Sequence, residues 1–217
     1  MKLFVDTGNI KDIETLSALG IIDGVTTNPS LLAKEPGDYK QNLKKICGIV
    51  KGPVSGEVVA TEFDAMIREG HEIAAIDEHM VVKVPLTRNG IRACKTLSQE
   101  GIRVNVTLVF SAAQALLAAK AGATFVSPFV GRLDDVGMTG MDLIGEIVQI
   151  FDNYDFTTEV LVASCRNPIH IIDAAKMGAD ICTCPSAVID QLFNHPLTNI
   201  GLEKFLKDWE KTFPAVK

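Results

Sequence analysis

One pattern recurs eight times along the chain: a short run of β-branched and apolar residues, a turn, and a stretch in which apolar residues have helical spacing. The strands that this pattern predicts are Lys2–Val5, Gly24–Thr27, Val54–Val59, Met80–Val84, Arg103–Leu108, Thr124–Ser127, Glu159–Ala163 and Asp180–Thr183. Helices are predicted between them, among others at Asn9–Leu19, Thr61–Ile76, Gly90–Gln99, Ala112–Ala121, Asp142–Phe151 and Pro168–Met177. Several strands are apolar almost throughout, which is typical of parallel strands buried on both faces.

Eight units in 217 residues give about 27 residues per unit, close to the minimum for a parallel β-α-β crossover. This spacing predicts a small α/β protein with a (β/α)8 TIM barrel. An open doubly wound sheet is the alternative, but no G-x-G-x-x-G motif follows the first strand and no phosphate-binding G-x-x-x-x-G-K-S/T motif occurs. Gly101, Gly122 and Gly178 stand where helices are expected to end. No linker divides the chain, so we expect one barrel domain over residues 1–217.

A further amphipathic segment follows the eighth unit. Leu202–Thr212 alternates charged residues with Leu202, Phe205 and Trp209 at helical spacing, which predicts an extra helix in a C-terminal arm at residues 198–217. Two roles remain open for this helix: it covers its own barrel, or it docks on a neighbouring subunit.

The charge balance excludes one class of partner. The chain carries 21 Lys and Arg against 27 Asp and Glu, a net charge of −6, whereas nonspecific nucleic-acid binding needs a basic surface. A few local cations can still hold a small anion.

The cysteines and histidines predict neither a disulfide framework nor a metal site. The five cysteines are Cys47, Cys94, Cys165, Cys182 and Cys184, and no two have C-x-x-C spacing. Cys182 and Cys184 would share one face of a strand, which favours a buried pair of small apolar side chains over a pair of ligands. The four histidines show no metal-ligand spacing.

No targeting or membrane segment is predicted. The apolar N-terminal run is too short for a signal peptide, because Asp6 interrupts it. The longest uncharged stretch, Val104–Ala119, contains several polar residues and is shorter than the roughly 20 apolar residues of a membrane span. Together with free thiols, which fit a reducing compartment, this predicts a cytoplasmic protein.

Polar residues gather where the predicted strands end, and in a (β/α)8 barrel these ends surround the active site. The candidate site residues are Asp6, Asn28, Glu57, Lys83, Asn105, Thr107, Ser127, Phe129, Arg132, Ser164 and Arg166. Almost every strand contributes at least one of them, so we expect them to meet at one mouth of the barrel.

Lys83 constrains the chemistry most, because it lies between two valines and a Val-Pro pair. A lysine in apolar surroundings has a lowered pKa, and its neutral amine can attack a carbonyl to form a Schiff base. The alternative is a structural lysine that points to the surface or forms a salt bridge.

Schiff-base chemistry needs groups that transfer protons, and Asp6, Glu57 and the hydroxyl of Thr107 are candidates. Two alternatives stay open: Asp6 caps the following helix, or Glu57 is only a charge partner of Lys83.

The other polar candidates predict the substrate class. Asn28, Asn105 and Ser164 suit substrate hydroxyls, or else they satisfy backbone groups at strand ends. Arg132 and Arg166 follow the sixth and seventh strands, where two guanidinium groups suit a phosphate dianion. Their alternative is pairing with a nearby acid such as Asp134 or Asp135. We therefore expect a small phosphorylated carbonyl compound as substrate.

Six motifs in order along the chain resemble the transaldolase family. They are Phe4-Val5-Asp6-Thr7, Gly24-Val25-Thr26-Thr27-Asn28-Pro29-Ser30, Val81-Val82-Lys83-Val84-Pro85, Asn105-Val106-Thr107-Leu108, Ser127-Pro128-Phe129-Val130-Gly131-Arg132 and Ala163-Ser164-Cys165-Arg166-Asn167. The resemblance covers essentially the whole chain, and the length is that of the short branch that also contains the fructose-6-phosphate aldolases.

The resemblance implies transfer of a dihydroxyacetone unit from fructose 6-phosphate or sedoheptulose 7-phosphate to erythrose 4-phosphate or glyceraldehyde 3-phosphate, in the non-oxidative pentose phosphate pathway. It implies no metal and no organic cofactor. It further implies a homo-oligomer, because short members tend to form rings of five subunits that often stack to ten.

The resemblance also assigns roles. Lys83 matches the Schiff-base lysine, Asp6 the group that moves a proton when the C3–C4 bond breaks and forms, and Glu57 with Thr107 the pair that activates a catalytic water. Substrate-binding positions are Asn28, Asn105, Ser127, Phe129, Ser164, Arg132 and Arg166, the two arginines for the phosphate.

Two other functions stay open. Fructose-6-phosphate aldolases typically carry Gln where Glu57 stands and Tyr where Phe129 stands, so both positions match transaldolase better. A non-catalytic phosphosugar-binding barrel has no reason to keep the buried Lys83.

Overall fold

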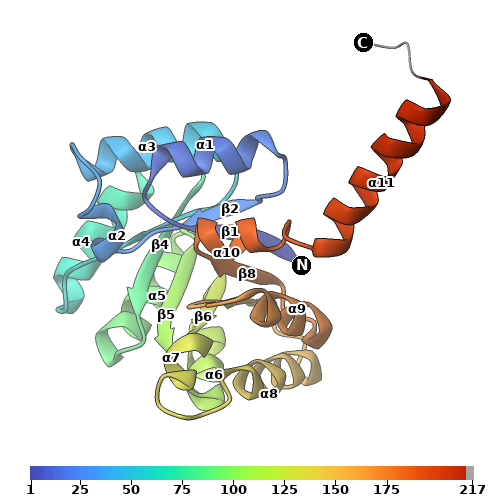
Figure 1. Cartoon of the computed structure of the whole chain (residues 1–217). Helices are drawn as coiled ribbons and strands as arrows, with labels where there is room; N and C mark the ends of the chain where they lie inside the picture. The colour runs from blue at the N-terminus through green and yellow to red at the C-terminus, as the bar shows by residue number, and fades with distance from the viewer. Residues whose placement is uncertain (214–217) are drawn as a thin grey trace.

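The predicted strands close into a parallel barrel whose strand order is the chain order (Figure 1). The computed structural model describes residues 1–213. The strands are β1 (Lys2–Asp6), β2 (Gly24–Thr26), β3 (Val54–Glu57), β4 (Met80–Pro85), β5 (Val104–Val109), β6 (Phe125–Pro128), β7 (Glu159–Val162) and β8 (Ile181–Cys184). β8 pairs with β1 in parallel and completes the barrel. The predicted α/β (β/α)8 TIM barrel is confirmed.

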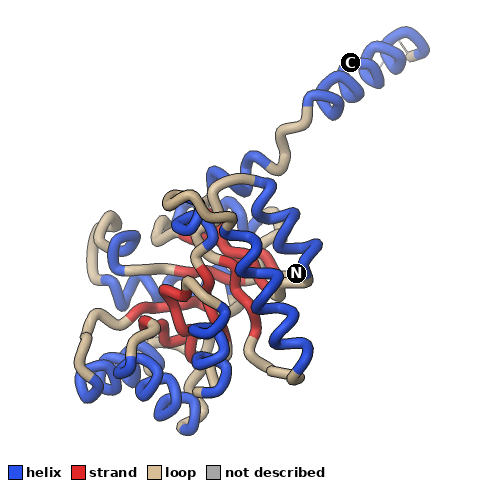
Figure 2. Tube along the Cα trace, turned by 90° about the horizontal axis from the view of Figure 1, so that it is seen from below, coloured by secondary structure: helices blue, strands red, loops and turns tan. Residues whose placement is uncertain are grey.

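Helices surround the strands (Figure 2). They are α1 (Ile10–Ala18), α2 (Pro29–Leu32), α3 (Tyr39–Val50), α4 (Phe63–Ala74), α5 (Arg88–Gln99), α6 (Ala112–Lys120), α7 (Val130–Asp134), α8 (Gly140–Asn153), α9 (Pro168–Met177), α10 (Ser186–Gln191) and α11 (Pro196–Thr212). The six helices predicted by range agree within two residues at each end. Gly101, Gly122 and Gly178 follow helices with φ of 82°, 87° and 83°, which confirms them as helix-ending glycines. Within residues 1–213, no helix is long and apolar enough to cross a membrane.

Alternation along the strands produces two apolar layers. The larger one lies between strands and helices, where Val82 and Val84 of β4 pack with helix residues such as Ile46 and Leu97. A smaller cluster fills the inside of the barrel and consists of Phe4, Val81, Phe125, Leu161, Ile181 and Ala163. The polar residues that follow on the same inward faces therefore lie above an apolar floor.

Gly24 leaves space for the ring of Phe4, one of the large side chains of this apolar floor. A Cβ at this position would lie 2.5 Å from Cζ of Phe4, too close for any side chain. The Phe4 ring meets Phe125 edge to face, with 6.2 Å between the ring centres. The glycine in β2 is thus required by packing.

All five cysteines are free and buried, as the odd count and spacing predict. Cys182 and Cys184 share the outer face of β8 and pack in the larger apolar layer, which confirms the buried pair. Cys165 adds a third thiol, with its Sγ 3.3 Å from Sγ of Cys182. Burial raises the pKa of Cys94 to about 12, so this thiol stays protonated near neutral pH.

The C-terminal helix projects away from the barrel (Figure 1). Helix α11 begins at Pro196, earlier than predicted, and none of its residues is buried. Of the two roles left open, covering its own barrel is wrong. The last four residues of the predicted arm, 214–217, lie outside the described residues. A single domain over residues 1–217 therefore stays a prediction.

Candidate active site

Four side chains predicted to carry the chemistry lie near the carboxyl ends of β1, β3, β4 and β5. Asp6 ends β1 and Glu57 ends β3. The strand register places Lys83 of β4 beside Glu57 on one side and beside Asn105 of β5 on the other. Thr107 lies two residues beyond Asn105 and shares its inward face. The barrel thus collects these groups at one mouth.

Lys83 is almost completely buried, with 5% of its surface exposed. Its Nζ donates to the backbone carbonyl of Thr27 at 3.0 Å and lies 3.0 Å from Oε2 of Glu57. The apolar neighbours predicted from the sequence, Val82 and Val84, face the helices instead, so the amine itself meets oxygen atoms. In the structure, Lys83 and Glu57 form the salt bridge that was the structural alternative for this lysine. Glu57 is also placed to accept a proton from the ammonium, which would leave an amine able to attack a carbonyl.

Asp6 is held by a chain of hydroxyl groups. Oγ1 of Thr26 donates to Oδ1 of Asp6 at 2.7 Å and lies 2.7 Å from Oγ1 of Thr183. Burial raises the pKa of Asp6, although the hydrogen bond from Thr26 and the charge of Lys83 act in the opposite direction. The cap of α1 is Asn9, so the capping alternative for Asp6 is wrong. A buried carboxylate with a raised pKa is a stronger base than an exposed one.

Thr107 and Asn105 differ in how their polar atoms are satisfied. Asn105 donates from Nδ2 to Oγ of Ser55 at 3.2 Å and accepts at Oδ1 from the Ser127 hydroxyl at 2.7 Å. Oγ1 of Thr107 is buried and has no hydrogen-bond partner among the described residues. An unpaired buried hydroxyl costs free energy, which a bound water or substrate group would relieve.

A cavity of about 190 Å³ opens above Lys83. Its lining residues are Asp6, Thr26, Asn28, Lys83, Ser127, Phe129, Arg132, Ala163, Ser164, Arg166 and Thr183. Eight of the eleven predicted site residues are among them. Glu57, Asn105 and Thr107 do not line this cavity, and the first two are joined to it through their contacts with Lys83 and Ser127.

The two arginines lie at the rim of the cavity and contact different partners. The guanidinium of Arg132 stacks over the ring of Phe129, 4.9 Å from its centre. Nη2 of Arg166 lies 2.8 Å from Oδ2 of Asp135, so the alternative of pairing with an acid holds for Arg166. Both side chains of this pair are more than half exposed, and such pairs contribute about 0–1 kcal/mol. A phosphate can displace the carboxylate at little cost.

Asn28 and Ser164 border the same cavity with distinct local roles. Oδ1 of Asn28 accepts from the backbone N–H of Leu31 at 3.0 Å and so caps α2, which matches the alternative of a satisfied strand end. Ser164 has a φ of 60°, a strained value for a residue with a side chain. Its carbonyl accepts from the N–H of Gly131 at 3.1 Å.

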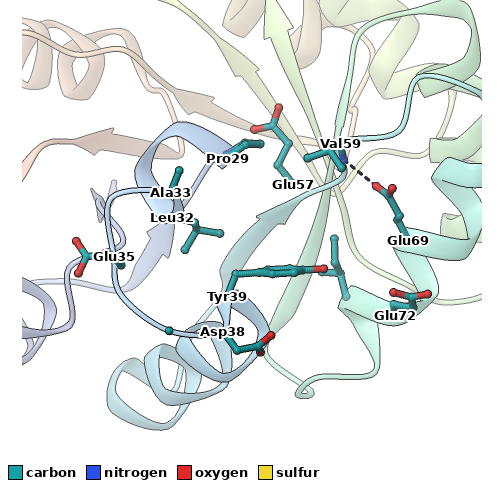
Figure 3. A pocket seen from close by; sticks show the side chains of 12 residues that line it. Pro29, Leu32, Ala33, Glu35, Asp38, Tyr39, Glu57, Val59, Glu69 and Glu72 are labelled. Atoms are coloured by element: carbon teal, nitrogen blue, oxygen red, sulfur yellow. Dashed lines mark hydrogen bonds between the residues drawn. The ribbon is translucent and has the colours of Figure 1, made fainter.

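Glu57 also borders a second cavity, of about 580 Å³, which was not predicted from the sequence (Figure 3). Its lining residues are Pro29, Leu32, Ala33, Glu35, Gly37, Asp38, Tyr39, Glu57, Val59, Glu69, Glu72 and Ile73. Oε2 of Glu69 accepts from the backbone N–H groups of Val59 and Ala60 at 2.8 and 3.0 Å, the first of which Figure 3 marks. Glu69 thereby fixes the segment that follows Glu57.

The segment Lys34–Asp38 forms part of the wall of this second cavity. It connects α2 to α3, and Oδ1 of Asp38 caps α3 by accepting from the N–H of Gln41 at 2.9 Å.

Three hydroxyl groups that support the site, those of Ser55, Thr26 and Thr183, were not predicted from the sequence. Their spacing of two from other inward-facing residues could have identified them.

The fold and the site together define an α/β barrel that holds a buried lysine beside carboxylates and beneath two arginines, an arrangement suited to carbonyl chemistry on a small anion. A family model described as Transaldolase/Fructose-6-phosphate aldolase matches residues 3–216, and the chain belongs to that family. Similar curated proteins include "Probable transaldolase" of Methanococcus maripaludis, 59% identical over 210 residues, which are 97% of this chain and 98% of the relative. Another "Probable transaldolase", of Syntrophobacter fumaroxidans, is 58% identical over 215 residues, 97% of each chain.

Proposed function

We propose that the protein is a transaldolase that moves a dihydroxyacetone unit from fructose 6-phosphate or sedoheptulose 7-phosphate to erythrose 4-phosphate or glyceraldehyde 3-phosphate, as in the non-oxidative pentose phosphate pathway. The observation that carries the proposal is the buried Lys83, whose Nζ lies 3.0 Å from a carboxylate oxygen of Glu57. The names of the similar proteins and the family membership support the same activity.

The first step joins substrate and enzyme. Glu57 accepts a proton from Lys83, and the neutral amine attacks C2 of the ketose to give a carbinolamine. Loss of water leaves a protonated imine. Glu57 and the hydroxyl of Thr107 handle the water that leaves here and returns at the end, and the unpaired Oγ1 of Thr107 supports that role.

The second step breaks the C3–C4 bond. Asp6 accepts the proton of the C4 hydroxyl, the bonding electrons move into the imine, and the aldose phosphate leaves. The dihydroxyacetone unit stays on Lys83 as an enamine. When the acceptor aldose arrives, C3 attacks its carbonyl carbon and Asp6 returns the proton. The raised pKa of Asp6 suits a group that must both accept and donate.

Positions around these groups hold the substrate. Asn28, Asn105, Ser127 and Ser164 offer hydrogen bonds to the dihydroxyacetone unit, and Phe129 supplies an apolar wall. Arg132 and Arg166 bind the phosphate of the sugar, with Asp135 released from Arg166. No step in this scheme calls for a metal or an organic cofactor.

Acceptor dependence tests the function. We expect fructose 6-phosphate and erythrose 4-phosphate together to give sedoheptulose 7-phosphate and glyceraldehyde 3-phosphate, and fructose 6-phosphate alone to react slowly, as measured by chromatography of the sugar phosphates. Phe129→Tyr should raise release of free dihydroxyacetone about tenfold or more, because a phenol hydroxyl can donate a proton where the Phe129 ring cannot.

A matched control is Phe110→Tyr, since this ring packs against Phe129 with 5.9 Å between centres. Phe110→Tyr should leave the ratio of dihydroxyacetone transfer to dihydroxyacetone release unchanged. Rapid release of dihydroxyacetone by the unaltered protein would make it an aldolase, the alternative function. Absence of any reaction would leave a phosphosugar-binding barrel.

We infer that the protein is a homo-oligomer, a pentamer or a decamer, in which α11 contacts a second copy. The support is an unburied helix on which Leu202, Phe205, Leu206 and Trp209 share one face, with Phe205 exposed by 72% and Trp209 by 55%. The charged residues Lys204 and Lys207 lie on the opposite face of the helix.

Charge on the apolar face should prevent assembly. We expect Phe205→Glu together with Trp209→Glu to sediment as a single 23.4 kDa chain, and the unaltered protein to sediment as a multiple of it. Lys204→Glu together with Lys207→Glu is the control and should stay assembled. A double variant that sediments like the unaltered protein would refute the role of α11.

The cytoplasmic location stays a prediction that rests on the free thiols.

A further inference from the structure

A buried histidine lies behind the two rim arginines. His170, in the first turn of α9, is 8% exposed, and both of its ring nitrogens have partners. Nδ1 accepts from the backbone N–H of Arg166 at 3.3 Å. Nε2 lies 3.1 Å from Oδ2 of Asp134, the last residue of α7.

One of these contacts has a fixed direction. A backbone N–H can only donate, so Nδ1 of His170 is the acceptor, while Nε2 lies within ion-pair distance of the Asp134 carboxylate. The other oxygen of Asp134, Oδ1, accepts from the N–H of Gly140 at 2.8 Å. The carboxylate is therefore held at the start of α8, and the imidazole ring spans the distance from Asp134 to the main chain of Arg166.

The two segments joined by this ring are the ones that carry the arginines. Arg132 lies within α7, and Arg166 follows β7. The segments also touch directly at Gly131, where an added Cβ would lie 2.2 Å from the carbonyl oxygen of Ser164 and 2.7 Å from Nε of Arg166. Direct packing thus fixes one point of contact between them, and His170 with Asp134 fixes another.

We propose that His170 and Asp134 are positioning residues that set Arg132 and Arg166 at the spacing needed for the phosphate of the sugar. The inference rests on the proposed function, since it assigns the phosphate to these arginines. His170 acts through the main chain of Arg166 and does not line the cavity above Lys83. Its loss should therefore weaken phosphate binding and leave the chemistry at Lys83 intact.

Substitutions of His170 separate its two bonds. We expect His170→Ala to raise KM for fructose 6-phosphate and for erythrose 4-phosphate about tenfold, a loss of about 1.4 kcal/mol of binding. His170→Asn keeps an acceptor near the position of Nδ1, and His170→Gln keeps a donor near that of Nε2, so each should lie between His170→Ala and the unaltered protein. Asp134→Asn should raise the same KM values.

A substrate without phosphate distinguishes loss of phosphate binding from a general disturbance of the active site. A general disturbance would weaken binding of both kinds of substrate. Borohydride traps dihydroxyacetone on Lys83 without any phosphate contact, and the concentration for half-maximal trapping should be unchanged in every His170 variant. The matched control is His79→Asn, because Nδ1 of His79 is also paired with an aspartate, Asp77, at 2.8 Å but lies at the start of β4, away from the mouth. Its KM values should not change.

Two outcomes would overturn the inference: unchanged KM values in all His170 variants, or KM and half-maximal trapping rising together. If His170→Ala fails to fold, His170→Asn and His170→Gln decide the question. The proposed function fails separately, if the unaltered protein traps no dihydroxyacetone on Lys83.

Discussion

The Lys83→Arg variant is expected to lose at least about 10³-fold of the turnover with fructose 6-phosphate and erythrose 4-phosphate. A guanidinium stays protonated at any pH at which proteins are studied, so it cannot attack a carbonyl carbon. Because arginine keeps the positive charge opposite Glu57, the carboxylate is not left unpaired, and loss of activity is not explained by a buried unpaired charge.

Borohydride reduction with fructose 6-phosphate, followed by peptide mass spectrometry, checks this expectation. The unaltered protein should carry a reduced three-carbon adduct on Lys83, and Lys83→Arg should carry none. Lys2→Arg makes the same exchange in an exposed ion pair with Glu159 and should trap and turn over normally. An adduct on a different lysine, or full activity of Lys83→Arg, would remove the mechanism.

Asp6→Asn should lower turnover about 10²- to 10⁴-fold while leaving Schiff-base formation intact. The amide still accepts the hydrogen bond from Thr26, but it cannot take the proton released when the C3–C4 bond breaks. Trapping of dihydroxyacetone on Lys83 should therefore proceed as in the unaltered protein. Loss of trapping along with turnover would mean that Asp6 acts in imine formation instead.

The same substitution should stabilise the fold. Burial raises the pKa of Asp6 in the folded chain above its ordinary value, so the folded state binds this proton more tightly than the unfolded state. The contribution of Asp6 to the free energy of unfolding therefore falls as the pH rises from its pKa in the unfolded chain to its pKa in the folded chain. Above the folded-state pKa the contribution stays at this lower value. Asn removes that loss.

Thermal unfolding of both proteins between pH 4 and pH 7 measures the effect. The midpoint of Asp6→Asn should exceed that of the unaltered protein at pH 7, and the difference should shrink toward pH 4. A lower midpoint for Asp6→Asn at pH 7 would show that Thr26 and Lys83 stabilise the carboxylate more than burial penalises it. A higher midpoint for Asp6→Asn at pH 7 would illustrate the general trade of stability for activity at catalytic positions.

The strands and the catalytic positions could be predicted because both follow from local patterns. Apolar runs between helical stretches mark the strands, and polar residues at their ends mark the mouth of the barrel. Helix α7 was not predicted, because it has only five residues and its backbone is set by contact with a distant segment: the N–H of Gly131 donates to Ser164.

Contacts between residues far apart in the sequence account for what the sequence could not predict. The link between Thr26 and Thr183 joins the second strand to the last one, and Asn105 meets Ser55 across 50 residues. The surroundings of Lys83 were predicted as apolar because its chain neighbours are valines, but those valines point to the other side of the strand. Periodicity identifies the face of a residue, whereas its partners on that face come from other strands.

The separation of the inner apolar cluster from the outer one has an evolutionary consequence. Most of the buried apolar residues lie between strands and helices, where Ile46, Leu97 and their neighbours hold the barrel together without lining the cavity above Lys83. The inner floor around Phe4 and Phe125 closes the barrel below the polar layer. Substitutions at the mouth can therefore alter the reaction while the cohesion of the scaffold is preserved, so that new specificities can be sampled by descendants of this gene without first losing the folded state.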